Sequence, residues 1–487
     1  MEQRMENKSS IKKNFVMNAI LQLSSVVFPL ITFPYVNRIL LPVGTGKVSF
    51  AVSLIAYFNI FAQLGVPTYG IRACAKARDS KLNLTRTVHE LLIINLITST
   101  IAYLFLIIAL LFIPRLQDDR CLYIIVSSTI FLNTIGMEWL YKGLEQYKYI
   151  TVRSVCFKFV ALIAMFLLIH QQNDYMIYGF LTIFAASASN LLNFVHAHKY
   201  IDMRYVGGYQ LGKHIKAVSV FFAMACATTI YTNLDTIMLG FMTSDIDVGY
   251  YNAAIKSKNV LVSLVASLGA VLLPRNSYYI EHNMLDEFKK VSNKALEFVF
   301  VAAMPLLVFF IIFAEPVILL LAGPEYYEAI LPMKVIMPTL LFIGITNVLG
   351  LQILVPLGRE KIVLYSEIVG ALVDLVLNAI LIPVLHSTGA ALGTLVAEFV
   401  VLIVQFWCLR SEFSNAFKSI HYGRLIIGVA LASFSSFWVL ILPVGSIVQL
   451  VISSILFFGI YIAFLVIRKD PIVLESFKLL RGLLEKR

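Results

Sequence analysis

The sequence predicts an all-α integral membrane protein with fourteen transmembrane helices, and three observations support this fold class. Of 487 residues, 59% are hydrophobic and 14% are charged, whereas soluble domains carry about 25% charged residues. The mean hydropathy is +0.84. Apolar runs of about 20 residues, long enough to cross a bilayer as helices, recur along the chain. The alternating segments of about 10 residues that are typical of a membrane barrel do not occur.

The fourteen predicted helices follow one another with short connections, and several contain proline, which membrane helices tolerate and which often marks a kink. Pro29 and Pro34 fall in the first helix and Pro338 in the tenth. The predicted spans are 15–40, 47–66, 88–113, 120–141, 152–170, 174–197, 215–240, 249–273, 295–314, 329–356, 361–385, 389–409, 424–442 and 446–467.

The distribution of Lys and Arg predicts the orientation of these helices. With the N-terminus inside, thirty-two of the 39 Lys and Arg residues fall in cytoplasmic segments, including Arg153 and Lys158. The outer loops hold only Lys47, Arg115, Arg120 and Lys334. Such asymmetry indicates a multi-pass membrane protein with both termini in the cytoplasm. It also explains the net charge of +11 without a nucleic-acid partner.

The organisation of the chain predicts two lobes. Residues 198–214 contain Gly207 and Gly208 and are interpreted as a cytoplasmic linker between an N-lobe at 1–197 and a C-lobe at 215–409. A weak repeat supports this division, because AlaGlnLeuGly ends at Gly65 and AlaSerLeuGly ends at Gly269. We therefore expect two pseudo-symmetric six-helix lobes around a central cavity, a common transporter plan. Residues 410–487 supply two further helices and an amphipathic tail that lies at the inner interface or is solvated.

A few charged residues within the apolar runs are the candidate functional residues, because a membrane tolerates charges only where they face protein or water. Asp235 and Lys256 lie at about equal distances from the turn near Asp245, so they either neutralise each other within one lobe or face the cavity. Lys258 points about 200° away from Lys256 on a helix. Arg38 either extends to lipid headgroups or meets Asp235 as a gate.

Asp374 and Glu398 lie in the eleventh and twelfth predicted spans, on either side of the turn near Ser387. An antiparallel hairpin places them level with each other. Two carboxylates at one depth in a low dielectric raise at least one pKa or recruit a cation, which suits coupling to Na⁺ or H⁺. The alternative is local hydrogen bonding, for example with Asn378. Glu138 and Lys142 are spaced for an ion pair between i and i+4.

Enzyme and metal motifs are not found in the sequence. There is no GxxxxGK[ST], no GxSxG and no His-x-x-x-His, and the five cysteines are scattered without a Cys-x-x-Cys pair. We therefore expect neither catalytic residues nor a resident metal or cofactor. Transport work must then come from ion gradients, the membrane potential or mass action.

Several motifs together resemble the polysaccharide transport family of the multidrug/oligosaccharidyl-lipid/polysaccharide exporter superfamily, the Wzx-type flippases. The resemblance spans nearly the whole chain and depends on the order and spacing of the motifs. They are PheProTyrValAsnArgIleLeu at 33–40, LeuGlyValProThrTyrGlyIleArg at 64–72, GluTrpLeuTyrLysGlyLeuGluGlnTyrLysTyr at 138–149, AsnLeuAspThrIleMetLeuGly at 233–240 and GlyProGluTyrTyrGluAla at 323–329.

The resemblance implies a flippase of a bacterial cytoplasmic membrane that works by alternating access. It would move the oligosaccharide repeat units of capsule, O-antigen or a similar surface polysaccharide, linked to undecaprenyl pyrophosphate, from the cytoplasmic to the outer leaflet. Glycosyltransferases and a polymerase are the implied pathway partners. Arg38, Arg72, Lys256 and Lys258 are the implied substrate contacts. Arg38, Asp235 and Lys256 are candidates for a gate or ion pair, and Asp374 and Glu398 for ion coupling. The alternatives are a flippase for teichoic acid or lipid-linked peptidoglycan precursors and a multidrug/cation antiporter.

Overall fold

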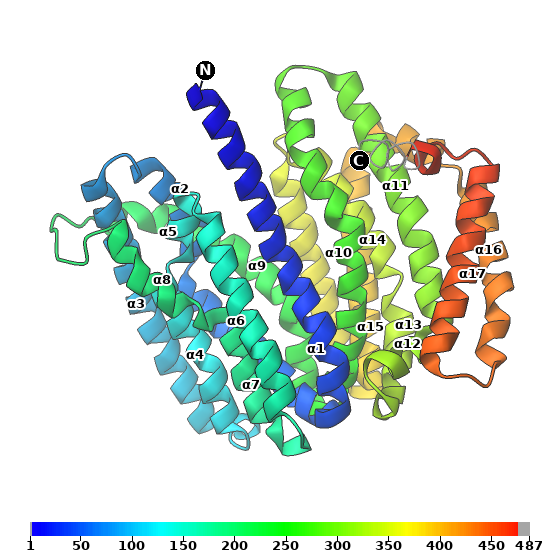
Figure 1. The fold of residues 1–487 in the computed structure, drawn as a ribbon, viewed down its shortest axis with the longest axis horizontal. Helices are drawn as coiled ribbons and strands as arrows, with labels where there is room; N and C mark the ends of the chain where they lie inside the picture. Colours follow the sequence, from blue (N-terminus) through cyan, green and yellow to red (C-terminus); the bar gives the residue numbers. More distant parts are fainter. Residues whose placement is uncertain (1, 476–487) are drawn as a thin grey trace. The chain divides into compact units, whose positions relative to one another are not determined.

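The computed structural model of this chain describes residues 2–475, and this part is built from helices (Figure 1). The packing of the helices divides the chain into two compact units, Met1–Gly249 and Tyr250–Arg487. The helices that lie wholly in the first unit are α1 (Glu2–Gln63), α2 (Val66–Ala77), α3 (Lys81–Phe112), α4 (Arg120–Gly136), α5 (Glu138–Gly143), α6 (Tyr147–Leu168), α7 (Tyr175–Ile183), α8 (Asn190–His196) and α9 (Gly212–Met242).

The second unit contains most of α10 (Asp245–Glu281), whose first residues belong to the first unit. Its other helices are α11 (Leu285–Ile312), α12 (Ala314–Leu321), α13 (Ile330–Ile336), α14 (Thr339–Asn347), α15 (Glu360–Ser419), α16 (Tyr422–Phe437) and α17 (Ser446–Ile467). Short 3₁₀ segments are η1 (Pro114–Leu116), η2 (Gln172–Asp174), η4 (Ala197–Lys199), η5 (Pro324–Ala329) and η7 (Trp438–Ile441), and π-helical segments are η3 (Phe184–Ala188) and η6 (Val348–Leu354).

Two of the long helices each contain two predicted spans joined by a sharp bend. In α1 the bend is at Leu41, with φ 57°, and in α15 it is at His386, with φ 51°. By length and composition, 10 helices of the described chain can cross a membrane, or up to 11 if one bent pair counts as a single span. The all-α membrane class is confirmed, whereas the count of fourteen stays a prediction.

Helix α9 belongs to the first unit because it packs along the second half of α1 and against α2. The boundary between these two packing units therefore comes after α9, at Gly249. The predicted lobe boundary within 198–214 stays a prediction. This division rests on packing, whereas the predicted lobes rest on an internal repeat, so the six-helix symmetry stays a prediction. The predicted tail from residue 476 onward lies outside the described residues.

Within the second unit, α16 and α17 pack on each other, and both contact α11. Gly428 of α16 permits this approach, because a Cβ atom there would lie 3.0 Å from the Phe464 ring of α17. The Tyr461 hydroxyl of α17 donates a hydrogen bond of 2.9 Å to the Val301 carbonyl of α11. The last two predicted spans are therefore anchored to the helices before them.

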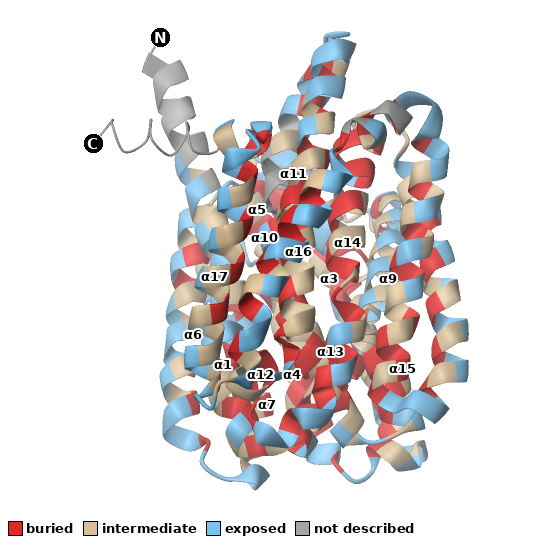
Figure 2. Cartoon of the chain, turned by 90° about the vertical axis from the view of Figure 1, so that its right-hand side faces the viewer, coloured by how far each residue is buried: buried red, intermediate tan, exposed pale blue. Residues whose placement is uncertain are grey.

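Large apolar side chains are exposed along many helices. Figure 2 marks exposed residues along α17 and α6, among other helices. Exposed examples are Ile455 and Ile467 on α17 and Phe159 and Leu167 on α6. Water would not tolerate so much contiguous apolar surface, whereas lipid tails are as apolar as these side chains. The chain is a multi-pass membrane protein.

Candidate functional site

The candidate residues with charged side chains on α1, α2, α9 and α10 have different environments. Arg38 and Arg72 are exposed, and Arg38 donates a hydrogen bond of 3.0 Å to the Pro34 carbonyl. Asp235 is buried on α9. Lys256 is half-buried and Lys258 is buried on α10. Arg38 and Asp235, which the sequence assigns to different lobes, belong to one compact unit.

The α15 hairpin places Asp374 and Glu398 level with each other. A Cβ atom on Gly393 would lie 2.3 Å from Asn378 Oδ1, and Gln405 Nε2 donates to Ser366 Oγ over 3.0 Å. Both pairs join residues at equal distances from the turn, and along the hairpin Asp374 and Glu398 lie between them. Asp374 is 2% exposed and Glu398 is 7% exposed. The hairpin therefore holds two buried carboxylates at one depth.

The second half of α1 and α9 run antiparallel in close contact. A Cβ atom on Gly240 of α9 would lie 2.1 Å from Cδ2 of Phe50 on α1, so the Phe50 ring packs directly on this glycine. Nearer the other end, the Tyr57 hydroxyl donates to the Ile230 carbonyl over 3.4 Å. This register places Asp235 between the two contacts, where α9 packs against α1.

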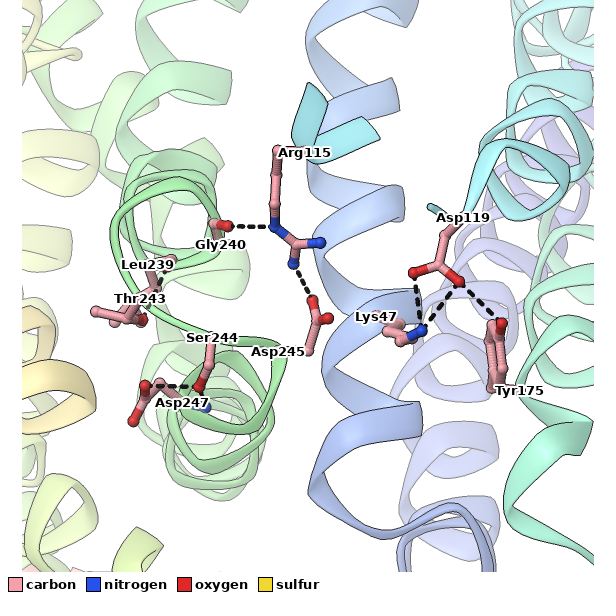
Figure 3. A network of polar contacts seen from close by, with 10 residues as sticks. All are labelled: Lys47, Arg115, Asp119, Tyr175, Leu239, Gly240, Thr243, Ser244, Asp245 and Asp247. Carbon is pink, nitrogen blue, oxygen red and sulfur yellow. Dashed lines mark hydrogen bonds and ion pairs between the residues drawn. The ribbon is translucent and has the colours of Figure 1, made fainter. Parts of the chain in front are cut away.

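The predicted outer end of the first unit, where α1 bends at Leu41, carries a polar cluster that we call the loop-end network (Figure 3). Arg115 of η1 donates through Nε to the Gly240 carbonyl over 2.9 Å and forms an ion pair with Asp245. Its guanidinium also lies 5.2 Å from the centroid of the Phe50 ring. Arg115 thus ties the connection after α3 to the junction of α9 and α10.

A second part of the loop-end network joins α1, α7 and the segment just before α4. Lys47 Nζ lies 2.9 Å from the carboxylate of Asp119, which is 4% exposed. The Tyr175 hydroxyl donates to the same carboxylate over 2.8 Å, and Lys47 Nζ lies 4.9 Å from the Tyr175 ring centroid. Three segments therefore share one buried carboxylate.

Two glycines bring the α1 bend into backbone contact with the α9–α10 junction. A Cβ atom on Gly46 would lie 1.7 Å from the Asp245 carbonyl oxygen, and one on Gly249 would lie 2.2 Å from the Pro42 carbonyl oxygen. Only glycine leaves room for two backbones at this distance. The bend and the junction are thus in direct backbone contact.

Sequence reasoning missed the loop-end network. It treated Lys47 and Arg115 only as two of the few cations in outer loops. Cations are rare in the predicted outer loops, and this rarity could have indicated that Lys47 and Arg115 each pair with a carboxylate. By contrast, the predicted pair of Glu138 and Lys142 is confirmed at 2.9 Å.

At the opposite end of the first unit, a buried carboxylate holds the segment that precedes α9. We call Tyr69, Glu90, Gln210, Lys213 and His214 the Glu90 cluster. Glu90 is fully buried and accepts from Gln210 N over 2.6 Å, from His214 Nε2 over 2.7 Å and from Lys213 Nζ over 2.8 Å. His214 Nδ1 lies 2.8 Å from the Tyr69 hydroxyl. The cluster fixes the start of α9 to α2 and α3.

Comparisons with known proteins agree with this architecture. A 24% identical relative from Escherichia coli (strain K12) is named "Putative O-antigen transporter"; the match covers 83% of this chain and 98% of the relative. A relative of the same name from Shigella dysenteriae is 25% identical over 81% of this chain and 98% of its own length.

Solved structures share the fold at low identity. The lipid II flippase MurJ in an inward closed conformation has a TM-score of 0.70 at 16% identity, covering 94% of this chain and 99% of its own. An inward-facing multidrug resistance MATE family transporter has a TM-score of 0.63 at 14% identity, covering 83% of this chain and 99% of its own.

Two family models match the sequence. The family described as MatE matches residues 220–380. The family described as Polysaccharide biosynthesis protein matches residues 11–280, more than half of the chain, and includes most of α1 and all of α2 to α9 with the loop-end network and the Glu90 cluster. This chain therefore belongs to the polysaccharide biosynthesis protein family.

Proposed function

We propose that this protein is a flippase that moves oligosaccharide repeat units linked to undecaprenyl pyrophosphate from the cytoplasmic to the outer leaflet of a bacterial cytoplasmic membrane. The observation that carries the proposal is the match over 98% of a relative named as an O-antigen transporter. Sugars and phosphates cross hydrocarbon poorly, because each unsatisfied polar group costs several kcal/mol. A protein path with polar and cationic side chains offsets that cost.

Reconstitution tests the proposal directly. The purified full chain is placed in liposomes with a fluorescent oligosaccharide on a polyprenyl diphosphate, and a membrane-impermeant quencher measures the lipid that reaches the other leaflet. We expect the quenched fraction to exceed that of liposomes without the chain. No difference would overturn the proposal. Faster movement of a lipid-linked peptidoglycan or teichoic-acid precursor, or of an organic cation, would instead support one of the two alternative functions.

Coupling to Na⁺ or H⁺ through Asp374 and Glu398 is part of this proposal. Two buried carboxylates at one depth repel each other unless one is protonated or a cation lies between them. A site that takes up a proton or cation in one state and releases it in another converts an ion gradient into transport. Asn378 lies beside Gly393, as Asp374 does, and adds an amide oxygen of the kind that binds Na⁺.

We expect Asp374→Asn and Glu398→Gln to change the Na⁺ or pH dependence of flipping, because each removes one negative charge from the pair. The measurement is the initial flipping rate in proteoliposomes over a range of Na⁺ and pH. Glu412→Gln is the matched control on α15, since its exposed carboxylate pairs with Arg359 at 2.7 Å. Unchanged dependence in both variants of the buried pair would leave these residues with a structural role.

Arg38 and Asp235 are proposed to form an ion pair that holds the predicted outer end closed. Because both residues belong to the first unit, opening would move α9 relative to α1. We expect Arg38→Asp and Asp235→Arg singly to abolish most flipping and the double swap to restore part of it. Flipping rates with matched protein amounts measure this, and a double variant no better than the singles would contradict the pair.

A further inference from the structure

A pocket of about 380 Å³ lies within the first unit, between α1, α5, α6 and the chain from α7 to the π-helical segment η3. We call it the Arg153 pocket. Its polar lining includes Gln22, Ser25, Lys142, Arg153, Lys158 and Ser189. A π-helical segment within a helix often marks a functional site, and η3 forms one wall through Ala185 and Ala186.

Arg153 is the unusual member of this lining. Its side chain is 7% exposed, and its Nε and Nη1 atoms are buried without a hydrogen-bond partner among the described residues. The guanidinium lies 5.7 Å from the Tyr149 ring centroid. A buried cation whose hydrogen bonding is incomplete carries a large desolvation cost, and an unsatisfied buried polar group often indicates a missing water or ion.

The other charges of the pocket make it cationic. Lys158 Nζ donates to Ser24 and Ser25 of α1 over 2.9 Å and 2.8 Å, and its side chain is half-buried against that helix. Lys142 pairs with Glu138, the one carboxylate among the described residues of the lining. Three cations thus face one anion in this part of the chain, which favours a ligand with two negative charges. Arg and Lys together are the common side chains for binding phosphate groups.

The surroundings of the pocket suit a ligand attached to lipid. Two of the helices that line the pocket also carry exposed apolar side chains, which are Leu23 and Val27 on α1 and Phe159 and Val160 on α6. Such side chains contact lipid tails in a membrane protein. An anion in the pocket therefore lies beside helices along which a hydrocarbon chain can run.

A second pocket, of about 220 Å³, adjoins the first and shares Glu138 and Lys142 with it. Amide side chains line it together with Trp139; they are those of Asn59, Gln63, Asn133 and Asn190. Asn190 donates to Asn133 over 3.1 Å, and Trp139 Nε1 is buried with no partner in the described part of the chain. Amides that donate and accept beside an aromatic ring suit a ligand rich in hydroxyl groups.

We propose that the Arg153 pocket binds the diphosphate of a lipid-linked saccharide, and that the adjoining amide pocket takes the sugar next to that diphosphate. The identity of the ligand rests on the proposed function, whereas the binding of a diphosphate rests on the charges of the pocket alone. The described linings of the two pockets do not include the substrate contacts predicted from sequence, which are Arg38, Arg72, Lys256 and Lys258. The sequence analysis counted Arg153 among the cations of the cytoplasmic segments.

Binding to the purified full chain in lipid nanodiscs tests this inference with three probes: inorganic pyrophosphate, farnesyl diphosphate and farnesol. We expect farnesyl diphosphate to bind more tightly than pyrophosphate and farnesol to bind weakly. In Arg153→Gln the Kd for both diphosphates should rise at least about tenfold, a loss of about 1.4 kcal/mol, and Arg153→Lys should recover part of the affinity. Arg410→Gln is the control, because Arg410 is exposed and stacks on Trp407 at 4.3 Å outside the pocket.

Lys158→Gln gives a second route if Arg153→Gln folds poorly, and it should also weaken both diphosphates. Equal affinities in the wild type, Arg153→Gln and Lys158→Gln would overturn the site. Equal binding of pyrophosphate and farnesyl diphosphate would overturn the lipid-linked ligand. Diphosphate binding without flipping in proteoliposomes would support the pocket and contradict the proposed function. Unchanged flipping by Arg153→Gln would contradict the pocket and leave the function standing.

Discussion

Gly46→Ala and Gly249→Ala are each expected to force apart the α1 bend and the α9–α10 junction. The added methyl group would overlap a carbonyl oxygen, at 1.7 Å for Gly46 and 2.2 Å for Gly249. Because both neighbours are backbone atoms, no side-chain rotation can relieve the overlap. Overpacking of this kind typically costs about 1–3 kcal/mol and occasionally more. We therefore expect lower stability and a more open predicted outer end.

Thermal unfolding and cysteine labelling measure these two effects. In a cysteine-free background, Val248→Cys reports on the closed end, because Val248 is fully buried there. Its labelling by a membrane-impermeant maleimide should become several-fold faster with Gly46→Ala. Gly459→Ala is the control, since a Cβ atom at that position would meet no atom within 4 Å from the described residues beyond its own helical turn. Unchanged labelling and an unchanged unfolding midpoint would show that this packing does not close the end.

Glu90→Leu is expected to destabilise the first unit by about 3 kcal/mol, because hydrogen bonds to a charged group contribute about 1.5–3 kcal/mol and a broken buried pair costs more. The change strands the Gln210 amide and His214, which is 2% exposed. Lys213 is 43% exposed, so water can solvate its ammonium group and reduces its share of the loss. Glu90→Gln keeps the shape and should lose less.

The unfolding midpoint in detergent and the rate of proteolysis within residues 200–211 check this expectation. Asp202→Asn is the matched control, because Asp202 pairs with Lys81 at 3.4 Å while both side chains are more than half exposed. Such exposed pairs contribute about 0–1 kcal/mol. Comparable losses for Glu90→Leu and Asp202→Asn would contradict a special role for the buried carboxylate.

The proposed flippase function would place different demands on the two ends of the first unit. The loop-end network joins segments that are distant in sequence and must separate if that end opens. The Glu90 cluster fixes the start of α9. If the end of α9 at the loop-end network moves, the helix would therefore rotate about its start. The family assignment and the proposed flippase function make these two attachments the natural places for such movement to be controlled.

The sequence by itself determined the class of this protein and the features that depend on local order. Hydropathy and Lys/Arg asymmetry are properties of single segments, so they predicted membrane helices before any packing was known. The level positions of Asp374 and Glu398 also followed from the sequence, because a hairpin with a short turn leaves little freedom of register. The ion pair of Glu138 and Lys142 was also predictable, because residues four apart in a helix lie on the same face.

Only the tertiary structure decided which distant segments meet. Arg115 lies 130 residues before Asp245, and nothing in the local pattern selects that partner among the acidic residues of the chain. Likewise, the burial of Arg153 depends on α1 and α6 packing together. The position of α9 depends on glycines at the α1 bend and the α9–α10 junction, where two backbones lie in contact. Apolar helices in a membrane offer many nearly equivalent faces, so shape and a few buried charges choose among them.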